Sequence, residues 1–105
     1  MGSCRSSGVL TADAVVSAER CRLVSIHAQF TGTAATTVKV FDSATEASGK
    51  ELARIIVFTD AAAPTAVKDS STVEFDMHGV IAINGLFLQI SGASGFGAAV
   101  SVEYN

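Results

Sequence analysis

Residues 22–30 of the chain read RLVSIHAQF, and this stretch carries the clearest signal of the fold class. Apolar side chains recur at every second position, at Val24, Ile26, Ala28 and Phe30, with more polar residues between them. Successive side chains of an extended chain point to opposite faces, so a period of two residues predicts a β-strand with one apolar face. The spacing does not fit the three-to-four-residue repeat of an amphipathic helix.

Short segments of similar character lie on both sides of this stretch. Residues 73–77 also alternate between apolar and polar side chains, which predicts a half-buried strand. Residues 52–59 are almost continuously apolar around Ile55, which suits a strand buried on both faces or placed at a subunit contact. The other strand candidates are residues 9–10, 14–17, 36–41, 80–83, 86–91 and 98–104.

Turn-forming residues separate these segments. Asn84 and Gly85 lie between two apolar runs, and because both residue types tolerate positive φ, they predict a β-hairpin. The glycine-rich residues 92–97 are expected to form another hairpin turn, and His78 with Gly79 a simple turn. Further breaks and loops are expected at residues 31–33, 42–50 and 60–70.

The pattern as a whole predicts an all-β protein of about eight short strands. Apolar faces on so many strands need a second layer to cover them, so we expect a two-sheet antiparallel sandwich. Jelly-roll-like and immunoglobulin-like arrangements both remain open. We expect residues 1–8, rich in Gly and Ser, to form a flexible arm, and residues 9–105 to form one β-sandwich domain.

Composition argues against several classes of function. The chain has 105 residues, a net charge of −3 and 16% charged residues, and its Lys and Arg residues are scattered singly. Nucleic-acid binding requires concentrated positive charge, so no nucleic-acid partner is expected. No stretch is long and apolar enough to predict a membrane span. Cys4 and Cys21 are expected to be free thiols, although a disulfide between them is geometrically possible.

Residues capable of chemistry do not form a recognisable catalytic or metal-binding motif. His27 lies on the polar face of its predicted strand and His78 lies in a predicted turn, without spaced partners that suggest metal ligands. Glu74 and Asp76 share one strand face, which we interpret as a solvated surface. The chain has no Gly-x-Ser-x-Gly motif and no tryptophan. We therefore expect no enzyme activity, no catalytic residue, no cofactor and no metal.

The order of short segments resembles a group of small proteins encoded among the structural genes of tailed phages. The resemblance covers the chain apart from residues 1–8, and its motifs are signatures of strands and turns. The segments that carry it are Val9–Thr11, Cys21–Leu23, Thr36–Asp42, Ala47–Ala53, Asn84–Phe87 and Val100–Tyr104.

This resemblance implies a compact β-sandwich that acts as a structural protein of the virion. The leading expectation is a head decoration (cement) protein that binds the major capsid protein or other virion proteins. It would form a homo-oligomer, with a trimer favoured. A neck, tail or fibre component, or a receptor- or glycan-binding sandwich with a cleft near residues 42–50 or 60–69, is the alternative. A small hydrolase ranks last, since no base lies beside a nucleophile in the sequence.

Two apolar features are candidates for a contact surface, although both also fit a buried core. One is the continuous apolar run of residues 55–58, and the other is Phe87, whose place in the alternation puts it on the outward face of its strand. The candidate interface residues are Ile55, Ile56, Val57, Phe58 and Phe87.

Overall fold

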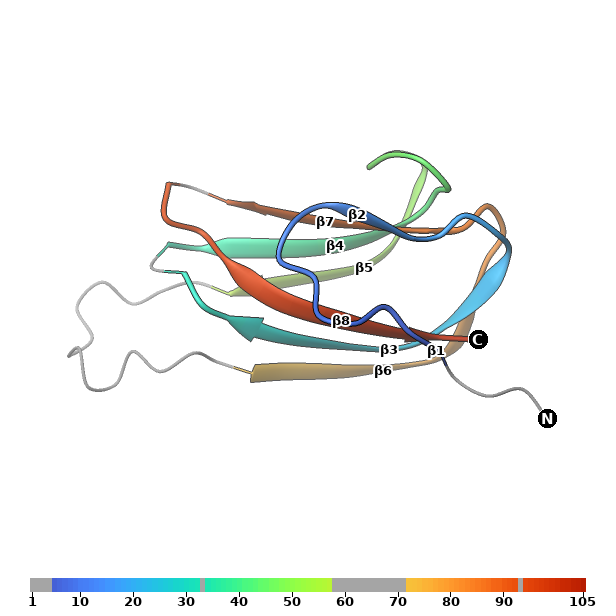
Figure 1. Ribbon diagram of the computed structural model, residues 1–105, viewed down its shortest axis with the longest axis horizontal. Helices are drawn as coiled ribbons and strands as arrows, with labels where there is room; N and C mark the ends of the chain where they lie inside the picture. Colours follow the sequence, from blue (N-terminus) through green and yellow to red (C-terminus); the bar gives the residue numbers. More distant parts are fainter. Residues whose placement is uncertain (1–4, 33, 58–71, 93) are drawn as a thin grey trace.

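The structure is a computed structural model that describes residues 5–32, 34–57, 72–92 and 94–105. Within these ranges it contains strands and no helix, so the all-β prediction is confirmed. Eight antiparallel strands form two four-stranded sheets that lie one above the other (Figure 1). The strands are β1 (Arg5–Ser6), β2 (Ala14–Ser17), β3 (Cys21–Phe30), β4 (Thr36–Asp42), β5 (Lys50–Val57), β6 (Thr72–Ala82), β7 (Leu86–Gly92) and β8 (Ala98–Tyr104).

The strand order is that of a jelly roll. Sheet A has the order β1-β8-β3-β6 and sheet B the order β2-β7-β4-β5. Each strand is followed by one in the opposite sheet, except that β4 is followed by β5 in the same sheet. An immunoglobulin-type sandwich instead pairs its first two strands within one sheet. The structure therefore confirms the two-sheet sandwich and selects the jelly-roll alternative.

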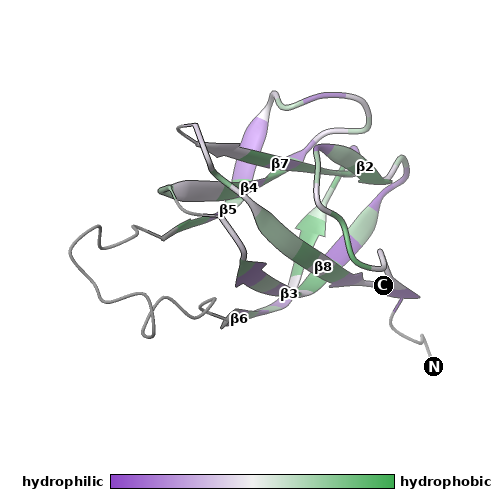
Figure 2. Ribbon diagram, turned by 60° about the vertical axis from the view of Figure 1, so that its left-hand side comes forward, coloured by the Kyte–Doolittle hydropathy of each residue, from purple (hydrophilic) through white to green (hydrophobic). Residues whose placement is uncertain are grey.

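The hydrophobic core lies between the two sheets. The ribbons of β7 and β8 carry mostly apolar residues (Figure 2), and alternate side chains of each strand point into the core. The buried apolar residues are Cys21, Leu23, Ile26, Ala28, Phe30, Val38, Val40, Ile55, Ala82, Leu86, Leu88, Ile90, Ala98, Val100 and Val102.

The prediction for Val24 was wrong. A β-bulge places both Val24 and Ser25 opposite Glu103, because Leu23 pairs with Tyr104 and Ser25 with Glu103. The extra residue shifts the alternation, so Leu23 and not Val24 points into the core. Val24 is half-buried outside the core.

The two predicted hairpin turns are also wrong. β6 lies in sheet A and β7 in sheet B, so Asn84 and Gly85 carry the chain from one sheet to the other. The glycine-rich segment after β7 likewise leads across to β8 in sheet A. Gly85 has a φ of 143°, and a Cβ atom there would lie 2.4 Å from the carbonyl oxygen of Ser17. Close packing of this crossing therefore requires glycine.

His78 and Gly79 do not turn the chain, as the sequence suggested, but form a bulge within β6. Their φ values are 53° and 75°. Leu23 pairs with Val80 and Ser25 with Asp76, so three residues of β6 lie opposite Val24 alone. The segments predicted at 73–77 and 80–83 thus belong largely to one strand, which ends at residue 82.

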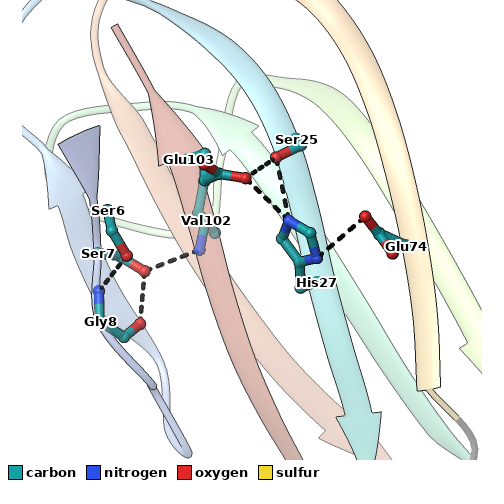
Figure 3. Close-up of polar contacts among 8 residues, drawn as sticks. All are labelled: Ser6, Ser7, Gly8, Ser25, His27, Glu74, Val102 and Glu103. Carbon is teal, nitrogen blue, oxygen red and sulfur yellow. Dashed lines mark hydrogen bonds and ion pairs between the residues drawn. The ribbon is translucent and has the colours of Figure 1, made fainter. Parts of the chain in front are cut away.

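The N-terminal segment contains an element where none was predicted. Arg5 and Ser6 pair with Tyr104 and Glu103 at the edge of sheet A. The Ser7 hydroxyl then accepts a hydrogen bond from the Val102 amide at 2.9 Å (Figure 3). These contacts use main-chain groups and a hydroxyl, so they leave no apolar pattern in the sequence. Residues 1–4 of the predicted arm and the whole of the loop predicted at 60–70 lie outside the described residues.

Candidate functional site

A polar cluster lies on the outer face of sheet A, where three strands meet. We call Ser25, His27, Glu74 and Glu103 the His27 cluster (Figure 3). The imidazole Nε2 of His27 lies 2.9 Å from Oε1 of Glu103, and its Nδ1 lies 3.6 Å from Oε1 of Glu74. The Ser25 hydroxyl donates to the same Glu103 oxygen at 2.6 Å and lies 3.3 Å from Nε2.

Strand register brings these residues together. His27 on β3 pairs directly with Glu74 on β6, and Ser25 pairs with Glu103 on β8. Directly paired residues of antiparallel strands place their side chains on the same face, about 5 Å apart. Alternation in the sequence put His27 and Glu74 on polar faces. It did not predict the cluster, because nothing in one strand's pattern identifies its neighbour in the sheet.

The surroundings of Glu103 stabilise its ionised form. The hydrogen bond from Ser25 is the largest influence that lowers the pKa of Glu103, followed by the hydrogen bond from His27. Together with the charge of His27 they outweigh desolvation, which acts in the opposite direction. When His27 is protonated, its two N–H groups face one carboxylate each, so the cation links β8, β3 and β6.

This geometry suits an interstrand clamp better than a nucleophile with its base. A serine nucleophile passes its proton to the histidine, but Ser25 directs its hydroxyl to Glu103 at the shorter distance. The two carboxylates also lie at opposite ring nitrogens of His27, so they do not converge on one point. In the described parts of the chain, no group of three His, Cys, Asp or Glu side chains is placed to hold a metal ion.

The second histidine lies away from this cluster. His78 is at the bulge of β6, and its Nδ1 lies 3.6 Å from Oδ1 of Asp76. Asp76 also accepts a hydrogen bond from the His78 amide at 2.8 Å. Both side chains are largely exposed, and the contact stays within the bulge. This pair therefore stabilises a local turn of the backbone.

A buried carboxylate fastens the crossing between β6 and β7. Asp42, at the end of β4, accepts hydrogen bonds from the amides of Ile83 at 3.0 Å and Asn84 at 2.7 Å. Burial acts to raise the pKa of Asp42, but the hydrogen bonds from Asn84, Ile83 and Gly85 and the charge of Lys50 lower it below the ordinary value. The sequence placed Asp42 at the start of a loop, whereas it ends a strand and holds a different connection.

Cys21 is a buried free thiol, as the sequence predicted. Burial is the main cause that raises the pKa of Cys21, and the negative charge of Asp42 acts in the same direction. A hydrogen bond with Ser17 opposes them. A thiol with these surroundings is held in its protonated, unreactive form. Cys4 lies outside the described residues.

The candidate interface residues of β5 occupy different positions. Ile55 is 4% exposed and belongs to the core, which was the other possibility for this run. Its neighbour Ile56 points outward and is 44% exposed. The side chain of Val57 and the whole of Phe58 lie outside the described part of the chain. Ile56 is therefore the one member of the run that the structure places at the surface.

Phe87 lies on the outer face of sheet B, on the side that its place in the alternation indicated. It pairs with Val15 on β2 and with Phe41 on β4, and these three apolar side chains form a row across the sheet. We call Val15, Phe41 and Phe87 the sheet B apolar row. Ile56 pairs with Thr37, which lies four residues before Phe41 on β4. The pair of Lys39 and Arg54 lies between Ile56 and the row on the same face of the sheet. The two predicted contact features are thus separate.

The fold and these surfaces define the chain as a jelly-roll β-sandwich with a polar cluster on the outer face of one sheet and an apolar row on the other. No helix in the described residues has the length and apolar character needed to cross a membrane. No protein-family model matches the sequence, and no curated protein and no solved structure shows a significant match.

Proposed function

We propose that this chain is a structural protein of a tailed-phage virion, most specifically a decoration protein that stabilises the head. The sheet B apolar row is the observation that carries the proposal. Val15 is 45% exposed, and the two aromatic side chains beside it are half-buried on a solvent-facing sheet surface. Aromatic side chains on rigid strands make good contact residues, because little conformational freedom is lost when they bind.

The charges next to this row fit the edge of a contact surface. Lys39 lies two residues before Phe41, on the same face of β4. Its partner on β5, Arg54, forms a two-point ion pair with Glu51. Contact surfaces in proteins commonly have an apolar centre and a charged rim. A surface this small binds weakly by itself. Repetition over a symmetric capsid lattice would multiply such contacts into stable attachment.

The resemblance to phage structural proteins and the jelly-roll architecture support the same role. Jelly rolls occur in viral capsid proteins, although they also occur in lectins and enzymes, so the fold alone does not define a function. In the proposed role the major capsid protein, or another virion protein, is the partner of sheet B. In this role the protein acts by binding its partner, and it does not need to catalyse a reaction.

Co-sedimentation with capsid shells tests the proposal. The chain is mixed with shells of the phage whose genome encodes it, and bound protein is measured after centrifugation. We expect wild-type protein to bind, Phe87→Asp to lose most binding, and Val9→Asp, a matched change at an exposed valine outside sheet B, to bind like wild type. Wild-type protein that stays in the supernatant, together with its absence from purified virions by mass spectrometry, would overturn the proposal.

A further inference from the structure

Exposed apolar side chains gather at the C-terminal end of β6. Val80 is 38% exposed, Ile81 is 45% exposed, and Ile83, directly after the strand, is 65% exposed. We call these three residues the β6 apolar edge. Three of the exposed large hydrophobic side chains of the described residues thus lie within the four positions 80–83. Single exposed apolar residues are ordinary, but this concentration, with Val80 on the inner face opposite Leu23 and Ile81 on the outer face opposite Arg22, favours a contact along the strand edge.

This strand is also at the edge of its sheet. Within the described residues, β6 pairs with β3 on one side and with no strand on the other (Figure 1). An edge strand presents backbone N–H and C=O groups that are free to pair with another strand. Arg22, which pairs with Ile81, exchanges its backbone hydrogen bonds with Asn105, so the N–H and C=O groups of Ile81 point away from β3, beside the apolar side chains.

The bulge divides the edge of β6 into two unlike parts. Before His78 and Gly79, the outer face carries Glu74 and Asp76, and Phe75 between them, on the opposite face, is 43% exposed. After the bulge, the exposed side chains are apolar. Bulges and charged side chains are devices that prevent edge strands from pairing, and both are found in the first part of the strand. The second part has neither.

We propose that the β6 apolar edge pairs, antiparallel, with the same segment of a second copy of this chain, with the twofold axis at Ile81. This register places Ile81 opposite Ile81 of the other copy and Val80 opposite Ala82. Each register centred on residue 74, 75 or 76 would place at least one of Glu74 and Asp76 directly opposite a carboxylate of the other copy, and directly opposed like charges destabilise strand pairs. The charge pattern therefore leaves the apolar part as the self-complementary one.

The crossing after β6 holds this surface in place before any partner binds. Asp42 accepts hydrogen bonds from the amides of Ile83 and Asn84, which fixes the backbone that carries Ile83. A fixed contact residue loses little conformational freedom on association. The contact is short, so the dimer forms at high protein concentration and is weak at low concentration. This inference does not depend on the virion role. It gives a twofold dimer, whereas the phage resemblance implies a trimer.

Solution mass provides the first test. We expect light scattering on the full chain, from about 10 μM to about 1 mM, to show the mass rising toward twice the 10.7 kDa of the chain. Ile81→Lys should remain monomeric over the whole range, while Val9→Lys, at another exposed position, should dimerise like wild type. A wild-type chain that stays monomeric throughout, or that forms a trimer, overturns the proposal.

A cross-linking experiment keeps the test independent of any folding defect in Ile81→Lys. In a Cys4→Ser background, Ile81→Cys should form a disulfide between copies under mild oxidation, because directly opposed residues of antiparallel strands have the Cα separation that a disulfide requires. It should do so at least about tenfold faster than Ile56→Cys on the other sheet, since pairing raises the local thiol concentration. Equal rates for the two variants would overturn the proposal.

Discussion

The carboxylate of Asp42 accepts a hydrogen bond from the backbone amide of Asn84 at 2.7 Å, although the two residues are 42 positions apart in the chain. One residue ends β4 in sheet B, and the other lies where the chain leaves sheet A. The amide of Ile83 donates to the other carboxylate oxygen. The end of the sandwich is therefore closed by one buried charge, which serves two neighbouring backbone amides.

We expect Asp42→Asn to destabilise the protein by about 2 kcal/mol at neutral pH, because hydrogen bonds to a charged acceptor are lost inside the protein. The pKa of Asp42 is lowered below 3.8, so the ionised group stabilises the fold above that pH and the effect is lost as pH falls through its folded pKa. The difference between variant and wild type should therefore shrink below about pH 4. Urea unfolding of both proteins at several pH values measures this difference in the free energy of unfolding. Glu19→Gln, at an exposed position, is the control and should change little.

The His27 cluster predicts an order of effects on Glu103. Ser25→Ala should raise the pKa of Glu103 toward its ordinary value of 4.5 more than His27→Gln does, because the serine hydrogen bond is the largest cause of the lowered pKa. Ionised Glu103 contributes its full stabilisation above that ordinary pKa, and the contribution is lost as pH falls through the lower pKa of the folded protein. NMR titration of the Glu103 carboxyl carbon gives the answer. An unchanged pKa in Ser25→Ala would contradict the geometry of the cluster.

Two glycines with positive φ separate the cost of backbone conformation from the cost of close packing. Gly85 has a backbone oxygen 2.4 Å from the position of an added Cβ, whereas Gly8, with a φ of 73°, has no atom within 4 Å. We expect Gly8→Ala to cost about 1 kcal/mol or less, from conformation alone. Gly85→Ala should cost distinctly more, because the crossing must move away from Ser17. Chemical denaturation compares the two variants, and equal losses would show that packing at the crossing is loose.

Ile55 and Ile56 test the assignment of the two faces of β5. Both are isoleucines on one strand, but the first is 4% exposed and the second 44%. Ile55→Ala should destabilise the protein by about 3 kcal/mol through lost burial and the cavity it leaves. Ile56→Ala should cost about 1 kcal/mol or less, since its side chain is largely solvated. Comparable losses in thermal or urea unfolding would mean that the strand faces are assigned the wrong way round.

Alternation within strands was sufficient to predict the all-β class and the two-sheet sandwich. It assigned Phe87 to the outer face of β7 correctly, because a period of two depends only on local chain geometry. It failed at Val24, where a bulge adds one residue, and no local signal in RLVSIHAQF marks that bulge. Asn84 and Gly85 were read as a hairpin because they permit positive φ. Whether the flanking strands then pair or separate into two sheets depends on tertiary packing.

The candidate site shows the same limit more strongly. His27, Glu74 and Glu103 are far apart in the sequence, and their contact follows from which strands are neighbours in sheet A. Phe87 was assigned to the outward face from its own strand. Its partners Val15 and Phe41 were not predicted, because they come from strands that precede it by dozens of residues. Pairing between strands, and not the pattern within them, was the missing information.

The position of β8 has a consequence for how the chain acquires its structure. This last strand lies between β1 and β3, so these two strands of sheet A have no common neighbour until β8 has formed. A chain emerging from the ribosome cannot complete that sheet until β8 has been synthesised. Non-local pairing of this kind is characteristic of slow folding. The unfinished chain meanwhile exposes apolar strands to aggregation, and deletion of β8 should abolish folding altogether rather than weaken it.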